Sequence, residues 1–228
     1  MTNNTIRVFT FGWSPEFVIR PLMEDGLSKG DVILLISSKP ESDYAKKRVE
    51  EAYQQVSSFV GMVGLSESLH YREIDVNRGF LEICRDIVRV IKDTERSYGS
   101  KRLRFYLTGG MRVLIVACLM VAKLLSSTSR AVEVKVSRED RPISFVIPVG
   151  LLKLEPREIT ESQLEVLRLL KRFGEASFEE LAIGRSEVTV RKHLTKLREK
   201  GVVSYTLKKK KQVYRLTPLG ELLLELVA

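Results

Sequence analysis

The first 150 residues repeat one pattern four times, a short run of apolar and β-branched residues followed by a longer amphipathic stretch. The apolar runs are IRVFTF, DVILLIS, LHYREI and RLRFYL, and the amphipathic stretches cover 16–28, 41–63, 78–97 and 111–125. Strand patterns that alternate with helical patterns are typical of a parallel sheet with helices on both faces. The repeat therefore predicts a Rossmann-like α/β domain.

Two further apolar runs, VEVKV and ISFVIP, follow the fourth repeat and are separated by the polar stretch SREDRP. They predict an antiparallel hairpin that ends the mainly parallel sheet. The pattern then lapses over VGLLKLEPRE, where Pro156 disfavours a continuous helix. We therefore expect a Rossmann-like domain over 1–150, a linker over 151–158 and a second domain over 159–228.

The second domain begins with a helical period. Thr160 is a suitable cap for a helix over ESQLEVLRLLKRF, and Gly174 ends it. One face of this helix carries Leu164, Leu167, Leu170 and Phe173. A short helix capped by Ser177, a third helix over 187–200, two strands joined by KKKK and a last helix near Pro218 follow. This order predicts a small winged helix-turn-helix domain.

The predicted third helix separates an apolar face from a polar one. At about 100° per residue, Val190, Leu194 and Leu197 fall together on the core side. His193 lies nearer to that side, so we expect it to pack or to bond the backbone. Residues in the N-terminal half of a helix in the major groove reach base edges, so the polar face supplies the candidate DNA contacts. They are Val188, Thr189, Arg191, Lys192, Thr195 and Lys196.

The positive charge of the chain is concentrated in this part of the sequence. The formal net charge is +9, and the stretch Arg185–Arg215 alone holds 11 basic residues against 2 acidic ones. Four lysines lie where the two strands reverse, and the tip of a hairpin can reach a phosphate backbone without crowding a core. We therefore expect phosphate contacts from Lys208, Lys209, Lys210 and Lys211, although a solubilising surface turn has the same composition.

The stretch RSEVTVRKHLTKLREKGVVSYTLKKKKQVYRLTPLGELLLEL resembles the winged helix-turn-helix domains of bacterial and archaeal transcription regulators, including the LTPLG opening of the last helix. The resemblance implies a homodimer that binds double-stranded promoter DNA at a palindromic site.

In an open parallel sheet, ligands bind beyond the carboxyl ends of the strands, where the strand order reverses. With the common order 3-2-1-4-5, the loop FGWSPEF after the first strand and the turn LTGGMR after the fourth share one crevice. Gly109 and Gly110 leave peptide N–H groups exposed at the start of a helix. Arg112 adds a positive charge, and Trp13 offers a ring face for stacking. These features predict an anionic, phosphorylated ligand. The alternative is that the glycines only allow close packing and that Trp13 covers the end of the sheet.

Several sites are disfavoured by the sequence. No GxGxxG follows the first strand and no GxxxxGK[ST] occurs, which argues against a dinucleotide cofactor and against P-loop hydrolysis. Cys84 and Cys118 lie in apolar helical patterns without CxxC spacing, so we expect core cysteines and no metal site. The N-terminus lacks a signal pattern, and the longest apolar run, 113–125, is too short for a bilayer. We expect a cytoplasmic protein that binds no membrane.

A Rossmann-like domain before a winged helix, with TGGMR after a hydrophobic strand and GWSP after the first one, resembles the CRISPR-associated Rossmann fold (CARF) regulators of the archaeal transcription-factor type. In that family the sensor domains pair about a two-fold axis and bind a cyclic oligoadenylate across the dimer. The resemblance implies a regulator of CRISPR-Cas loci whose regulatory ligand is cyclic tetra-adenylate, with no other cofactor. The implied ligand residues are Gly12, Trp13, Ser14, Thr108, Gly109, Gly110, Met111 and Arg112.

Two other functions remain open. Some CARF proteins cleave the ring that they bind, but the predicted crevice offers no obvious general base, and His70 lies near the third strand, away from it. We therefore expect a protein without catalytic residues. A regulator that senses an unrelated nucleotide or a phosphorylated metabolite would have the same domain order.

Overall fold

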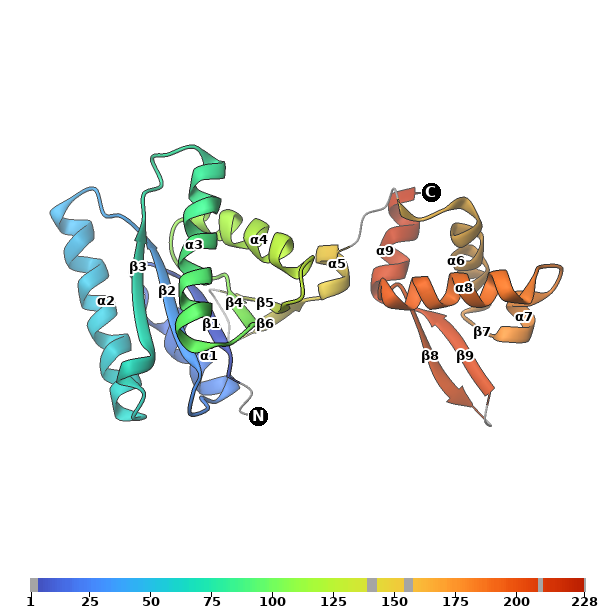
Figure 1. Ribbon diagram of the computed structural model, residues 1–228, viewed down its shortest axis with the longest axis horizontal. Coiled ribbons are helices and arrows are strands. Elements are labelled where there is room, and N and C mark those ends of the chain that lie inside the picture. Colours follow the sequence, from blue (N-terminus) through green and yellow to red (C-terminus); the bar gives the residue numbers. More distant parts are fainter. Residues whose placement is uncertain (1–3, 139–142, 154–157, 209–210, 228) are drawn as a thin grey trace. The chain divides into compact units, whose positions relative to one another are not determined.

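The computed structural model of the chain describes residues 4–138, 143–153, 158–208 and 211–227 (Figure 1). The chain forms two compact units, Met1–Val149 and Gly150–Ala228. Over the described ranges, no helix combines the length and the apolar composition that crossing a bilayer requires.

Among the described residues, the first unit is built on a six-stranded sheet with the order β3-β2-β1-β4-β5-β6. Its strands are β1 (Ile6–Phe11), β2 (Val32–Ser38), β3 (Leu69–Ile74), β4 (Arg102–Tyr106), β5 (Ala131–Ser137) and β6 (Ser144–Ile147). Neighbouring strands are parallel except β6, which runs antiparallel to β5. The structure thus confirms the mainly parallel sheet, its terminal hairpin and the 3-2-1-4-5 order.

Helices cover both faces of this sheet (Figure 1). They are α1 (Glu16–Asp25), α2 (Asp43–Met62), α3 (Phe80–Tyr98) and α4 (Arg112–Ser126), and a short 3-10 turn, η1 (Ser66–Ser68), precedes β3. Apolar residues of α1 and α2 form one buried cluster with Phe9, Phe11, Ile33 and Leu35 of the sheet. α3 and α4 contact each other, and right-handed crossovers place them on the opposite face. Because both faces are covered, β1 is buried along its whole length.

The second unit is a winged helix-turn-helix, as expected. Its elements are α5 (Val149–Lys153), α6 (Glu161–Phe173), β7 (Glu175–Ser177), α7 (Phe178–Ala182), α8 (Glu187–Glu199), β8 (Val203–Lys208), β9 (Lys211–Leu216) and α9 (Pro218–Val227). Thr160 and Ser177 cap α6 and α7 through their side chains. Leu167, Leu181 and Leu194 belong to one buried cluster that also includes residues of α9. The short strand β7, which the sequence did not predict, pairs with β9.

Two expectations about the helices are wrong. α1 ends at Asp25 and not at Ser28, because Gly26 follows with a φ of 65°, a left-handed conformation that ends the helix. Phe173 is 51% exposed and not part of the core. Each step of three residues falls about 60° short of a full helical turn. Phe173 lies three such steps after Leu164, so it points to the opposite side of the helix.

The expected linker contains regular structure. α5 includes 151–153, and the second unit already begins at Gly150. A Cβ atom at Gly150 would lie 2.7 Å from a methyl carbon of Leu219 and 2.9 Å from the carbonyl oxygen of Lys200. The chain therefore packs closely against the second unit from this residue on. Pro156 lies outside the described residues.

Candidate ligand cavity and nucleic-acid interface

A cavity of about 720 Å³ lies in the first unit, where β1, β2 and β4 end. It is lined mainly by the three loops that follow these strands. Seven of the eight predicted ligand residues line it: Gly12, Trp13, Ser14, Thr108, Gly109, Gly110 and Met111. The strand order explains this, because the carboxyl ends of neighbouring parallel strands meet at one edge of a sheet.

The loops after β1 and β4 approach each other through their glycines. A Cβ atom at Gly12 would lie 2.9 Å from the Cα atom of Gly110. Gly110 has a φ of 83°, and a Cβ atom there would lie 2.7 Å from the carbonyl oxygen of Phe11. At Gly109 the distance to the carbonyl oxygen of Thr10 would be 3.0 Å. Close packing alone thus accounts for these glycines, and it makes the two loops one continuous wall of the cavity.

The polar and aromatic groups of this wall differ in accessibility. Thr108 is buried, and its Oγ1 atom accepts a hydrogen bond from the Ser137 amide at 2.9 Å, which ties the turn to β5. Trp13 is 50% exposed, and its ring meets Tyr44 of α2 edge-on, with 6.0 Å between the ring centroids. About half of the Trp13 surface is therefore accessible for stacking.

Arg112 is the predicted ligand residue that does not line the cavity. It is the first residue of α4, directly after Met111, and it is exposed. Met111, half-exposed, is the last residue of the turn that reaches the cavity. Within one subunit, Arg112 therefore lies directly beside the wall of the cavity but outside its lining.

The loop between β2 and α2 forms a third wall that the sequence analysis missed. The lining residues of this wall are Ser37 and Ser38, which end β2, and Lys39, Pro40, Glu41 and Ser42 of the loop itself. A signal was available, because the predicted order also places the second strand beside the first. The hydroxyl-rich run SSKPES directly follows that apolar strand.

Helix amino ends surround the cavity. α1 begins beyond Ser14, α2 is capped by Ser42, whose Oγ atom accepts from the Ala45 amide at 3.1 Å, and α4 begins beyond Met111. Each amino end carries a partial positive charge. The carboxylate of Glu41 opposes this potential, but it accepts a hydrogen bond from Nδ2 of Asn77 at 2.9 Å. The arrangement suits an anion larger than a single phosphate.

Other titratable groups lie elsewhere. His70 of β3 does not line the cavity, and its Nε2 atom lies 2.6 Å from the hydroxyl of Tyr98. Partial burial lowers the pKa of His70. Cys84 and Cys118 are buried and free, as expected of core cysteines, and burial raises the pKa of the Cys118 thiol to about 12. The described part of the chain holds no cluster of three or more His, Cys, Asp and Glu that could bind a metal.

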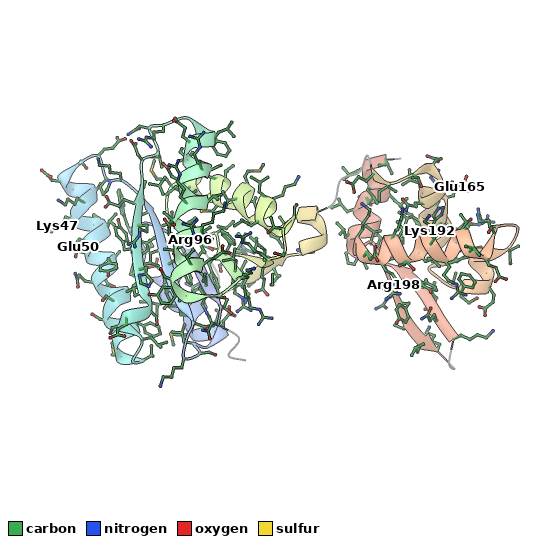
Figure 2. The ribbon with its side chains drawn as sticks, viewed as in Figure 1. Lys47, Glu50, Arg96, Glu165, Lys192 and Arg198 are labelled. Atoms are coloured by element: carbon green, nitrogen blue, oxygen red, sulfur yellow. The ribbon has the colours of Figure 1, made fainter. Side chains whose placement is uncertain are left out.

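In the second unit, α8 has the two faces that the sequence predicted. Val190, Leu194 and Leu197 are buried, and His193 is half-buried. All six candidate DNA contacts of this helix are exposed. Five of them, Val188, Arg191, Lys192, Thr195 and Lys196, line a shallow depression of about 500 Å³. Figure 2 labels Lys192 on this helix.

Aromatic rings hold two arginines of α8. The guanidinium of Arg191 lies 4.6 Å from the ring centroid of Phe178, and that of Arg198 lies 4.3 Å from the ring centroid of Tyr205. Such contacts restrict a guanidinium without neutralising it. Arg198 is not among the DNA contacts predicted from the sequence, although it lies seven residues after Arg191 and so on the same side of the helix.

The lysines of the hairpin lie where β8 and β9 reverse, as predicted. Lys208 ends β8 and Lys211 begins β9, while Lys209 and Lys210 lie outside the described residues. The Nζ atom of Lys208 is 2.5 Å from Oε1 of Glu175, and that of Lys211 is 3.7 Å from Oε1 of Glu179. Pairing between β7 and β9 brings these carboxylates to the hairpin. Part of its charge is therefore compensated within the unit.

Comparison with known proteins adds one extensive match. The Csa3 CRISPR-associated Rossmann-like domain matches residues 5–150. No curated protein matches the sequence of the chain.

Solved structures show partial likeness. A mutant of MarR from E. coli complexed with operator DNA is 24% identical, with 31% of this chain and 54% of that chain covered and a TM-score of 0.30. BpsR from Bordetella bronchiseptica is 22% identical, with 35% and 60% covered and a TM-score of 0.31. Csm6 from Enterococcus italicus, bound to cyclic hexa-2'-fluoro-hexa-dAMP, is 8% identical, with 86% and 51% covered and a TM-score of 0.49. The chain thus spans between half and three-fifths of the length of these proteins.

Proposed function

Since the chain belongs to the family of the Csa3 CRISPR-associated Rossmann-like domain, we propose that it is a DNA-binding transcription regulator of CRISPR-Cas loci controlled by cyclic tetra-adenylate. One observation carries this proposal: seven of the eight residues implied as ligand contacts line a single cavity. The same chain ends in a winged helix whose third helix exposes a basic face.

The cavity has the chemistry that a nucleotide ring requires. Its volume of about 720 Å³ lies in the range of small-molecule sites, about 300–1,000 Å³. Helix amino ends supply N–H groups and partial positive charge for phosphates. The exposed ring of Trp13 and the thioether of Met111 offer surfaces on which an adenine base stacks.

An exposed apolar face supports a homodimer. Val116, Met120 and Leu124 of α4 are 50%, 41% and 60% exposed, and their spacing of four residues places them on one side of the helix. Phe145 and Val146 of β6 are also exposed. An apolar face of this kind is typical of an interface. Since α4 starts at the turn that lines the cavity, a two-fold contact through α4 brings two cavities close to one ring.

The second unit binds double-stranded DNA through the exposed face of α8 and the basic hairpin. Side chains in the first half of α8 read base edges, and the lysines of the hairpin contact phosphates. Two such units in a homodimer recognise a palindromic promoter site.

Calorimetry with the full-length protein and cyclic tetra-adenylate tests the ligand. We expect saturable binding with one ring per dimer, and a shift in operator affinity when the ring is present. A stoichiometry of one ring per monomer contradicts the shared site, and the absence of any binding contradicts the ligand. Mass spectrometry of ligands retained by the native protein then identifies a different nucleotide or a phosphorylated metabolite.

Binding without cleavage is the second part of the proposal. The described residues that line the cavity include no histidine, and the carboxylate among them, that of Glu41, is hydrogen-bonded to Asn77. Incubation of labelled ring with the purified protein is expected to leave it cyclic. Linear product that forms in proportion to protein concentration indicates a ring nuclease instead.

A further inference from the structure

The β2–α2 loop contributes a full positive charge to the cavity, that of Lys39. Among the described residues that line it, Lys39 is the single lysine or arginine. The helix amino ends around the cavity carry only partial charges. A ligand with several phosphates needs a cation, and in this subunit Lys39 is the cation that the cavity provides.

The backbone of this loop is fixed at both sides of Lys39. The amide of Lys39 donates a hydrogen bond to the carbonyl oxygen of Ile74 at 2.9 Å, which attaches the loop to the end of β3. Pro40 follows with a restricted φ, and Ser42 caps α2. The loop therefore presents Lys39 from a defined position, and its side chain is exposed.

The charge of Lys39 is not used within the subunit. Across the described ranges, no carboxylate forms an ion pair with Lys39. The adjacent acid, Glu41, accepts its hydrogen bond from Asn77. An exposed lysine on a fixed loop, with no internal partner and facing a cavity, has the properties of an anion contact.

We propose that Lys39 binds a phosphate of the ligand and takes the role that the sequence assigned to Arg112. The inference rests on the proposed function and adds the β2–α2 loop to the ligand site. In a two-fold dimer, two copies of Lys39 contact one ring, and the hydroxyls of Ser37 and Ser38 lie beside them in the same wall.

The test compares Lys39→Met and Lys39→Arg with Lys47→Met in full-length protein titrated with cyclic tetra-adenylate. Lys47 is exposed on α2, where Figure 2 labels it beside Glu50. It does not line the cavity, so it is a matched control. Because two charged contacts per ring are lost, Lys39→Met is expected to weaken binding by at least about 100-fold. It should also reduce the dependence of affinity on salt. Lys39→Arg keeps the charge and should stay within about threefold of the wild type.

The outcomes separate this inference from the function on which it rests. A wild-type protein that binds no ring overturns the proposed ligand and the role of Lys39 with it. A wild-type protein that binds the ring, together with a Lys39→Met variant of equal affinity and salt dependence, overturns the role of Lys39 alone. Loss of binding in Arg112→Ala, with Lys39→Met unaffected, returns that role to Arg112. Urea denaturation with the same midpoint in all variants shows that the first unit, which holds every substituted residue, is folded.

Discussion

Gly110 combines two constraints at the wall of the cavity. Its φ of 83° lies in the left-handed region, and a side chain there would meet the carbonyl oxygen of Phe11. The position thus fixes the contact between two loops, whatever ligand binds beside them. A valine at this position would disturb the fold before it blocked a ligand.

We predict that Gly110→Ala lowers the free energy of unfolding of the first unit by about 1–3 kcal/mol. The matched control is Gly99→Ala, because Gly99 also has a positive φ, 70°, but nothing lies within 4 Å of a Cβ atom there. Gly99→Ala should lower the free energy of unfolding by about 1 kcal/mol, because only the positive φ and no steric contact opposes its methyl group. Urea denaturation measures both values, and equal losses would mean that the two loops separate to accommodate the methyl group.

Two basic residues of α8 have different surroundings, which predicts different roles. Lys192 is exposed and lines the depression along the helix, whereas Arg198 is held against Tyr205 near the hairpin. We predict that Lys192→Ala changes the selected DNA sequence, since a base contact is worth about 1–3 kcal/mol of discrimination. Arg198→Ala should weaken all sequences alike and lower the salt slope by about 1. Selection from a random DNA pool, with a salt titration, tests this pair, and exchanged behaviour contradicts it.

At the scale of the elements, carboxylates of the second unit compete with DNA phosphates for the lysines of the hairpin formed by β8 and β9. Glu175 and Glu179 pair with Lys208 and Lys211, and all four side chains are exposed. Phosphates must displace these carboxylates or tolerate them nearby. The internal ion pairs therefore reduce what the lysines contribute to DNA affinity.

We predict that Glu175→Gln combined with Glu179→Gln strengthens DNA binding by about twofold to tenfold at low salt, because each exposed pair is worth at most about 1 kcal/mol. The gain should vanish at high salt, where exposed charges are screened. Glu161→Gln is the control, since Glu161 pairs with Arg168 within α6. Fluorescence anisotropy over a range of salt concentrations measures all three proteins. Weaker binding by the double variant would show that the ion pairs are needed to position the hairpin.

Periodicity decided which elements the sequence could predict. The strands and helices of the first unit each contain enough residues to show a period, and the strand order placed the loops after β1 and β4 together. β7 has only three residues, Glu175–Ser177, so no period revealed it. Without β7, the proximity of Glu175 to Lys208 could not be foreseen. The same strand order also predicts the wall formed by the β2–α2 loop. The sequence marks this loop only by its hydroxyl-rich composition, SSKPES, and not by a glycine motif.

At the scale of the whole molecule, the proposed homodimer links ligand binding to DNA binding. If two subunits share one ring, each contributes half of the phosphate contacts. If the two subunits also share one palindromic DNA site, separating them lowers the affinity for the ring and the affinity for DNA. A change in the apolar face of α4 should therefore affect functions to which its residues make no direct contact.

We predict that Met120→Glu converts the dimer to a monomer. A carboxylate in the middle of the stripe formed by Val116, Met120 and Leu124 would have to be buried without a partner, which costs several kcal/mol at an apolar interface. Because Met120 is exposed in the single subunit, the fold itself should be retained. The monomer should bind cyclic tetra-adenylate at least about a hundredfold more weakly, since half of the contacts are lost.

Met62→Glu is the control for this variant, because Met62 lies at the end of α2 and is more exposed than Met120. Sedimentation velocity gives the oligomeric state of both variants, and calorimetry gives their affinity for the ring. Met62→Glu should match the wild type in both measurements. A Met120→Glu protein that stays dimeric places the interface elsewhere, for example on β6, where Phe145 and Val146 are exposed. A monomer that binds the ring as tightly as the wild type shows instead that one subunit holds the complete site, and that the apolar face of α4 serves assembly on DNA alone.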